Sequence, residues 1–203
     1  MSTVIPDGAG RRPDGRSLRA ERTREAIVGA LLALLDAGDL RPTAERIADR
    51  AGVSPRTVFQ HFPDRDGLIA AAAAEQEQRV RAMIAPIDPA LPLGERLGAF
   101  VEQRTRVLET ITGVRRAAIL LEPFSEVVAA KLRLVRGAAR AEIGHVFGAE
   151  IAAVPAAERD ELLEALTAAA SWPSWDALRR HQDLGLDAAR QVVSRTLAAL
   201  LDA

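Results

Sequence analysis

The feature that most limits the fold is the absence of any strand-like segment. No window alternates apolar and polar residues through a run rich in Val, Ile, Thr or aromatic residues, and the chain has no tyrosine. From Ser17 onward alanine, leucine, arginine and glutamate dominate, and these residues are strong helix formers. The chain is therefore expected to be all-α.

Capping residues and helix breakers place the expected helices. Thr43, Ser54 and Asp64 are suited to N-cap the second, third and fourth helices, and Gly52 to end the second. The prolines of 85–92 predict a loop. The helices are expected at about 17–37, 43–52, 54–62, 64–84, 93–110, 113–121, 124–147, 156–181 and 187–201, with Pro173 kinking or breaking the helix over 156–181 and Asp187 capping the last.

The charge pattern confines any nucleic-acid binding to a local patch, because the formal net charge is only −1. Residues 1–15 contain prolines and glycines with little to bury, and are expected to form a disordered arm. A basic arm suits the phosphate backbone of DNA, the alternative being a solvated tail. The positive charge is concentrated in residues 11–24, where six arginines outnumber two carboxylates. The arginines are Arg11, Arg12, Arg16, Arg19, Arg22 and Arg24, and the carboxylates are Asp14 and Glu21.

The chain has no cysteine, which excludes a disulfide framework, a thiolate metal site and a cysteine nucleophile. The N-terminus has no apolar segment typical of a signal peptide. The longest apolar stretches, near 26–35 and 69–74, are well short of the roughly 20 residues of a membrane span. We therefore expect a cytoplasmic protein that does not contact membranes.

The segment over 43–62, TAERIADRAGVSPRTVFQHF, predicts two short helices joined by a tight turn at Gly52. Ala48, Val53 and Val58 fall where the two helices must touch. The outward face of the second helix then carries arginine and glutamine, which pair with guanine and adenine edges, and threonine, which meets a thymine methyl. This pattern predicts a helix-turn-helix DNA-binding domain over 16–64, with an outward face of Pro55, Arg56, Thr57, Gln60 and His61.

The segment resembles the tetracycline-repressor (TetR) family of regulators. The resemblance covers about residues 17–70 and is carried by Thr23, Arg24, Ile27, Ala30, Thr43, Ile47-Ala48, Ala51-Gly52-Val53-Ser54, Thr57-Val58-Phe59, His61-Phe62 and 64–69. It implies a homodimeric transcriptional regulator that binds double-stranded operator DNA. The function expected from it is a repressor that a small-molecule ligand releases from a palindromic operator.

The resemblance also implies roles for individual residues. Bases in the major groove would be read by Pro55, Arg56, Thr57 and Gln60, and phosphates would be touched by Thr43, Phe59, His61 and Arg65. Ser54 and Thr43 begin helices, where backbone amides attract a phosphate. Phe59 stands where the family often has tyrosine and lacks its hydroxyl, so Phe59, like Phe62, is expected in the core. Alternatively, His61 only ends its helix, and Arg56 and Gln60 are solvated.

Residues 65–203 are expected to form a helical ligand-sensing and dimerisation domain, because the resemblance implies that the last two helices pair with those of a second subunit. Two apolar stripes agree with this, although burial within one subunit is the alternative. The first stripe comprises Leu162, Leu163, Leu166 and Ala169, and the second Val192, Val193, Thr196, Leu197, Leu200 and Leu201.

The candidates for a ligand pocket are mostly aromatic or apolar, which favours a small apolar ligand. The alternatives are plain core positions and, for the tryptophans, a dimer seam. The candidates are Phe100, Gln103, Arg104, Ile119, Phe124, Ile143, Phe147, Trp172 and Trp175.

Other functions have less support in the sequence. Glu142 and His145 show the Glu-x-x-His spacing of di-iron bundles, but no second copy exists. There is no HExxH pair, phosphate loop or Gly-x-Ser-x-Gly elbow. We therefore expect no metal site, no cofactor and no enzymatic activity. A DNA-binding protein without a ligand, controlled by a protein partner or by abundance, stays an alternative.

Overall fold

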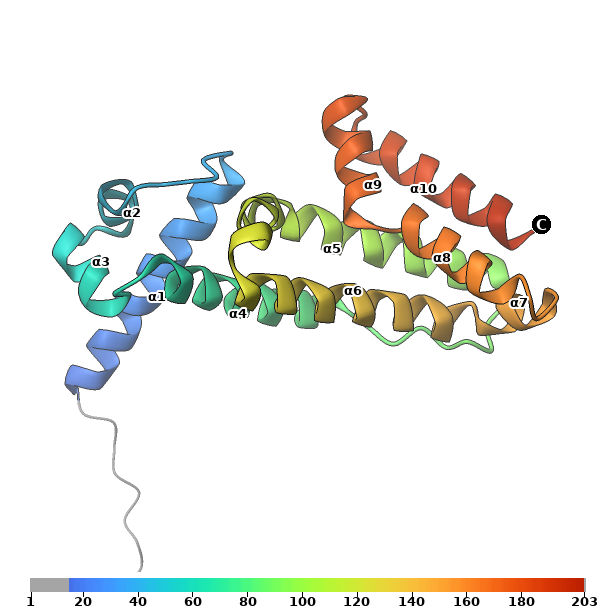
Figure 1. The fold of residues 1–203 in the computed structure, drawn as a ribbon, viewed down its shortest axis with the longest axis horizontal. Coiled ribbons are helices and arrows are strands. Elements are labelled where there is room, and N and C mark those ends of the chain that lie inside the picture. Colours follow the sequence, from blue (N-terminus) through green and yellow to red (C-terminus); the bar gives the residue numbers. More distant parts are fainter. Residues whose placement is uncertain (1–14, 203) are drawn as a thin grey trace, which may run out of the picture.

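The computed structural model describes residues 15–202, and every regular element in that range is a helix (Figure 1). The expected arm over 1–15 lies outside the described residues except for Gly15, which begins the first helix. The elements are α1 (Gly15–Asp36), α2 (Ala44–Ala51), α3 (Pro55–His61), α4 (Arg65–Met83), α5 (Leu93–Leu121), the 3₁₀ turn η1 (Glu122–Phe124), α6 (Glu126–Val146), α7 (Gly148–Ala153), α8 (Arg159–Ala169), α9 (Trp172–Asp176), the π-helical turn η2 (Ala177–His181) and α10 (Leu186–Leu201).

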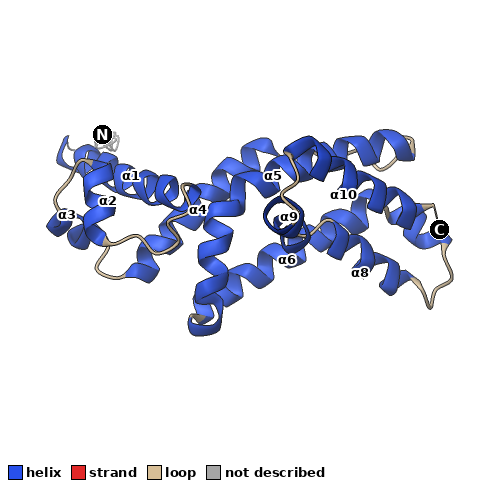
Figure 2. Cartoon of the chain, turned by 90° about the horizontal axis from the view of Figure 1, so that it is seen from above, coloured by secondary structure: helices blue, strands red, loops and turns tan. Residues whose placement is uncertain are grey.

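The helices form two units with separate cores, and α4 runs between them (Figure 2). In the N-terminal unit, Ile27 and Leu31 of α1 are buried against Ile47 of α2 and Val58 of α3. The first turns of α4 close this core with Ile69. Burial of Val58 in this core therefore fixes α3, which is too short to be stable alone.

The predicted caps of the N-terminal unit are confirmed. The Arg46 amide donates to Thr43 Oγ1 at 3.4 Å, the Thr57 amide to Ser54 Oγ at 3.2 Å, and the Gly67 amide to Asp64 Oδ1 at 2.7 Å. Gly52 ends α2 with a φ of +68°, a conformation that favours glycine. Local chemistry thus sets where α2, α3 and α4 begin.

The predicted break between 110 and 113 is wrong, because α5 is one helix from Leu93 to Leu121. Gly113 lies in its interior, where the chain packs against the end of α1. A Cβ at this position would lie 2.4 Å from Asp36 Oδ1 and 2.9 Å from the Asp36 backbone nitrogen. Gly113 therefore serves close packing of two helices and does not end one.

The C-terminal unit packs around a buried aromatic core. The rings of Phe100 and Phe147 meet edge to face at 5.2 Å, and Trp175, Leu166 and Leu197 are also almost fully buried. The helix expected over 156–181 is divided at 170–171, where a new helix begins with Pro173 in its first turn. The expected cap at Asp187 is wrong, because α10 begins at Leu186 after Gly185, and Asp187 instead pairs with Arg190.

One ion pair links α5 to α7 at the far end of the bundle. The Arg96 guanidinium is almost fully buried and donates to Glu150 Oε1 at 2.5 Å and to the Val146 carbonyl oxygen at 2.5 Å. These hydrogen bonds from Arg96 hold the pKa of the Glu150 carboxyl below its ordinary value. The ionised carboxylate therefore stabilises the folded state.

We expect Glu150→Gln to lower the free energy of unfolding by about 2 kcal/mol at pH 7, because Arg96 loses a charged acceptor in a buried place. The folded-state pKa lies below the unfolded value of about 4.3, so the stabilisation is present above that pH and is lost as the pH falls through the folded pKa. Urea unfolding at pH 7 and pH 3 measures this difference. Glu164→Gln is the control, since the Glu164 pair with Arg140 is exposed and should contribute little. Equal effects of the two variants at pH 7 would contradict the assignment.

Candidate DNA-binding face and ligand cavity

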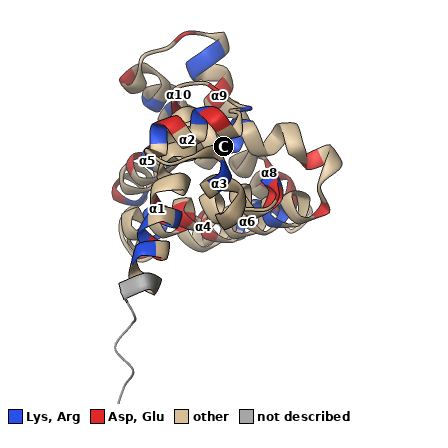
Figure 3. Cartoon of the chain, turned by 90° about the vertical axis from the view of Figure 1, so that its left-hand side faces the viewer, with Lys and Arg blue, Asp and Glu red and all other residues tan. Residues whose placement is uncertain are grey.

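The outer side of α3 is an exposed face at one end of the molecule. Figure 3 views this end, with α1–α3 toward the reader. Pro55, Arg56 and Gln60 are exposed on α3, while Val58 is only 3% exposed and anchors the helix to the core. The sequence from Ser54 to Pro63 contains no carboxylate. The face can therefore approach a phosphate backbone without charge repulsion from its own helix.

Two of the predicted contact residues are in direct contact with each other. The hydroxyls of Ser54 and Thr57 lie 2.9 Å apart, and the Thr57 amide donates to Ser54 Oγ. The Thr57 hydroxyl is thus already engaged at the start of α3. The Thr57 methyl group is therefore better suited to contact a base than the hydroxyl is to form a new hydrogen bond. At the start of α2, hydrogen bonds from the backbone and from the Thr43 hydroxyl lower the pKa of the Glu45 carboxyl.

The expectation that Phe59 lies in the core is wrong. Phe59 is 56% exposed, because Val58 takes the inward position and the next residue is turned about 100° around the helix. Phe62 is 4% exposed and confirms its expected core position, with the Arg24 guanidinium 4.3 Å above its ring centroid. Phe59 is therefore free to touch a ligand of this face.

The other predicted DNA-contact residues lie at helix ends around α3. Thr43 is exposed before α2, Arg65 is exposed in the first turn of α4, and His61 is half-buried in the last turn of α3. The exposed side chains of this face are thus placed by α2, by α3 and by the start of α4.

A cavity of about 380 Å³ lies between α4, α5 and α6. Its volume is in the range of small-molecule sites, about 300–1,000 Å³. Most of its lining is apolar. The lining residues are Asp66, Ile69, Ala70, Ala73, Ala74, Gln76, Glu77 and Val80 from α4, Val107, Ile111, Val114, Arg115 and Ala118 from α5, and Ser125, Val127, Val128, Lys131, Leu132 and Val135 from α6 and its cap.

None of the residues predicted for a ligand pocket lines this cavity. Phe124 is 84% exposed, and Ile119 packs against the C-terminal core from its edge. The other candidates are buried, and their side chains fill the protein interior instead of lining an open cavity. The buried candidates are Phe100, Gln103, Arg104, Ile143, Phe147, Trp172 and Trp175.

The polar groups among those candidates have partners inside the subunit. Gln103 Oε1 accepts from the Ala85 amide at 2.7 Å, and Arg104 donates to Glu142 at 2.7 Å. The two tryptophans donate to residues of α5, Trp172 to Thr112 at 3.1 Å and Trp175 to Glu109 at 2.8 Å.

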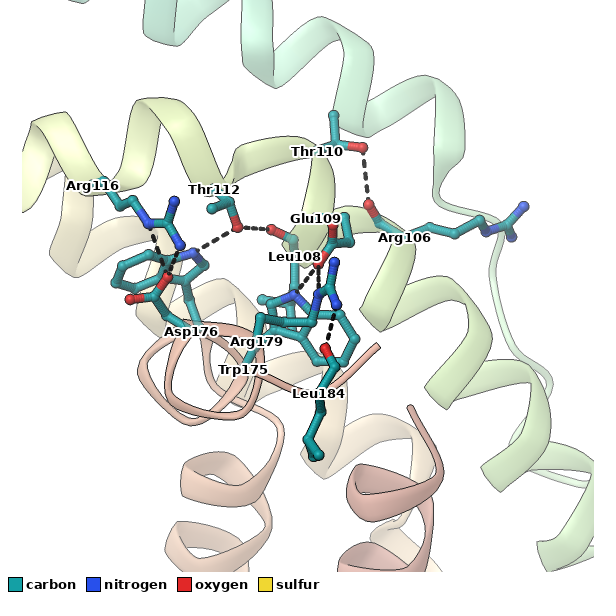
Figure 4. Close-up of polar contacts among 11 residues, drawn as sticks. Arg106, Leu108, Glu109, Thr110, Thr112, Arg116, Trp175, Asp176, Arg179 and Leu184 are labelled. Carbon is teal, nitrogen blue, oxygen red and sulfur yellow. Dashed lines mark hydrogen bonds and ion pairs between the residues drawn. The ribbon is translucent and has the colours of Figure 1, made fainter. Parts of the chain in front are cut away.

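The Trp175 contact belongs to a polar cluster that fixes α9 and η2 on α5 (Figure 4). Arg179 donates to the same oxygen of Glu109 and to the Leu184 carbonyl, and Arg116 pairs with Asp176 at 2.6 Å. Partly buried polar groups that satisfy each other in this way favour one arrangement of helices.

Sequence reasoning missed the residues that make the cavity. Its α4 wall is formed by Ala70, Ala73 and Ala74, whose small side chains leave the space open. The signal for them is the run AAAAA over 70–74, set one turn after the start of α4. By composition alone, the alanine run predicts a helix and not a cavity wall.

The two residues of the Glu-x-x-His pair lie in different environments. Glu142 is bound by Gln103 and Arg104, and His145 is exposed. Over residues 15–202 no group of three His, Asp or Glu side chains is arranged to hold a metal ion. In the same range, none of the helices combines the length and the apolar character that a membrane crossing needs.

Comparison with known proteins agrees with this geometry. The chain resembles a transcriptional regulator from Rhodococcus sp. Rha1, with a TM-score of 0.66, 16% identity, and coverage of 90% of this chain and 96% of the other. A TetR family transcriptional regulator from Pseudomonas syringae pv. tomato str. DC3000 gives a TM-score of 0.54, 23% identity, and coverage of 90% and 96%. No curated protein matches the chain significantly. Residues 27–72 match the model of the bacterial regulatory proteins of the tetR family.

Proposed function

We propose that this protein is a transcriptional repressor that binds a palindromic operator as a dimer and is released by a small molecule in the α4–α5–α6 cavity. The match of residues 27–72 to the tetR-family model supports a DNA-binding regulator over an enzyme. The observation that supports control by a ligand is the short connection between α3 and α4. Only three residues separate His61 from Arg65, and α4 then lines the cavity from Asp66 to Val80.

The proposed mechanism is a shift between two states of α4. Two α3 helices of a dimer must lie roughly 34–36 Å apart to enter successive major grooves. A ligand that fits the cavity better when α4 is displaced favours a spacing that does not match the operator. The ligand weakens DNA binding only by its difference in affinity for the two states.

The dimer is proposed through the outer faces of α8 and α10, which pack against each other. Much of the predicted stripe faces the subunit's own core, because Val193 and Leu197 are buried. The outer face of α10 still carries Val192, which is 39% exposed, beside the exposed Thr196. A charge at Leu197 would disrupt the subunit core, so Val192 is the position that tests the dimer.

We expect Val192→Glu to weaken the dimer about tenfold or more, because the interface would bury a carboxylate without a partner. Sedimentation velocity over a concentration series measures the dissociation constant. Leu134→Glu is the matched control, since Leu134 is 71% exposed on α6 and gains the same charge. Loss of the dimer in the control alone would place the interface on α6, and a monomeric wild type would contradict the dimer.

The whole proposal is tested with purified protein and genomic DNA fragments. Fragments selected by the protein should contain an inverted repeat with half-sites about one helical turn apart. A small molecule that binds the cavity should release the protein from these DNA fragments. Stable DNA binding that no compound in a broad set weakens would instead favour control by a partner or by abundance.

A further inference from the structure

Arg115 is a buried cation inside the apolar cavity. The residue lies about two turns before the end of α5, is 9% exposed and lines the cavity. Among the described residues its guanidinium makes no hydrogen bond and no ion pair. This is unusual, because a guanidinium carries five N–H donors and buried charges are almost always paired.

The acidic groups near Arg115 are bound by other cations. Glu122 accepts from both terminal nitrogens of Arg136, each at 2.8 Å. Glu77 is held by Lys131 and, at 2.6 Å, by Arg81. Arg115 therefore has no hydrogen-bonded partner among the described residues, and the Glu122 carboxylate, which attracts its charge, is hydrogen-bonded to Arg136 instead.

The electrostatic environment agrees with an unpaired charge. Burial, and then repulsion from Arg136, lowers the pKa of the Arg115 guanidinium from its ordinary value, and the attraction from Glu122 offsets only part of this. Arginine nevertheless keeps its proton in proteins, so the cavity holds a positive charge. An arginine with a purely structural role would be expected to have a partner in its own chain, as Arg96 and Arg116 do.

We propose that the cavity binds an amphipathic monoanion, an apolar body that ends in one carboxylate, with the carboxylate on Arg115. The apolar walls from α4, α5 and α6 would cover the body, and the planar guanidinium would bind the carboxylate through two parallel hydrogen bonds. Asp66 and Glu77 on the same lining disfavour a second negative charge. The role of this ligand in DNA release rests on the proposed function, but its binding does not.

The test is calorimetric titration of the full-length protein with decanoate, decanol and decyltrimethylammonium. Decanoate should bind about tenfold or more tightly than decanol, because only decanoate forms charge-assisted hydrogen bonds with Arg115, and the cation should bind most weakly. In Arg115→Leu the preference for decanoate over decanol should disappear while decanol still binds. Arg115→Lys should keep part of the preference, because it retains the charge without the fork.

A second variant tests the apolar part of the site. Ala73→Leu narrows the cavity from α4 and should weaken decanoate and decanol together, with the unchanged helical circular dichroism spectrum as the check on folding. Equal decanoate affinity in wild type and Arg115→Leu, equal affinity for decanoate and decanol in the wild type, or no decanoate binding at millimolar concentration would each overturn the proposal. Adding decanoate to the operator complex separates the two hypotheses. Arg115-dependent binding without DNA release contradicts only the proposed coupling, and DNA release without Arg115-dependent binding contradicts only the ligand assignment.

Discussion

Arg56→Ala is expected to weaken specific operator binding about thirtyfold or more. Arg56 is exposed on α3, whose inner side is fixed by Val58. Each lost base contact costs about 1–3 kcal/mol, and a symmetric dimer loses the contact in both half-sites, about 2–6 kcal/mol in all. Because the contact reads a base, the loss should fall mainly on operator DNA and much less on random DNA.

The control for Arg56→Ala is Arg180→Ala, which removes the same charge from an exposed position on η2 at the C-terminal unit. Fluorescence anisotropy with operator and scrambled DNA, at one fixed salt concentration, compares the variants. Equal losses in the two variants would mean that Arg56 contributes only to overall charge. Equal losses on operator and scrambled DNA would assign Arg56 to a phosphate.

The N-terminal unit was predictable because its decisive interactions are local. Thr43, Ser54 and Asp64 cap helices that begin at the next residue, and Gly52 takes the positive φ that the turn requires. Each of these rules involves residues within one turn of the chain. The exposed face of α3 follows from helical spacing when Val58 points inward.

Phe59 shows where spacing and residue type disagree. An aromatic side chain suggests burial, yet helical spacing puts Phe59 on the outer side of a helix that has only seven residues. Position on the helix therefore decides its exposure, and residue type does not.

The cavity could not be predicted from residue types, because it depends on distances between helices. Aromatic residues were expected around a ligand, but Phe100, Phe147 and Trp175 fill the core. The open space occurs where Ala73 and Ala74 of α4 face the larger residues of α5 and α6. The lack of a hydrogen-bonded partner for Arg115 likewise depends on a contact between distant residues. Glu122 is hydrogen-bonded to Arg136, which lies fourteen residues further along the chain.

Gly113→Ala is expected to destabilise the protein by about 2 kcal/mol, although alanine is the better helix former. The added Cβ would lie 2.9 Å from the Asp36 backbone nitrogen and 3.0 Å from the Leu35 carbonyl carbon. Backbone atoms cannot move aside as a side chain does, so α1 and α5 must separate. Overpacking of this kind costs about 1–3 kcal/mol, which exceeds the gain in helix propensity of up to about 1 kcal/mol.

The matched control lies in the same helix. At Gly98 an added Cβ meets no atom within 4 Å, so Gly98→Ala should stabilise the protein by about 0.5–1 kcal/mol. Urea unfolding of both variants therefore compares one chemical change at two positions of α5, and the two effects should have opposite signs. The larger Gly113→Val should destabilise the protein further, because its branched side chain meets the same backbone. If both alanine variants stabilised the protein, the close approach of α1 to α5 would not exist in solution. The cavity wall that continues from Gly113 into Val114 and Arg115 would then be positioned differently against α4.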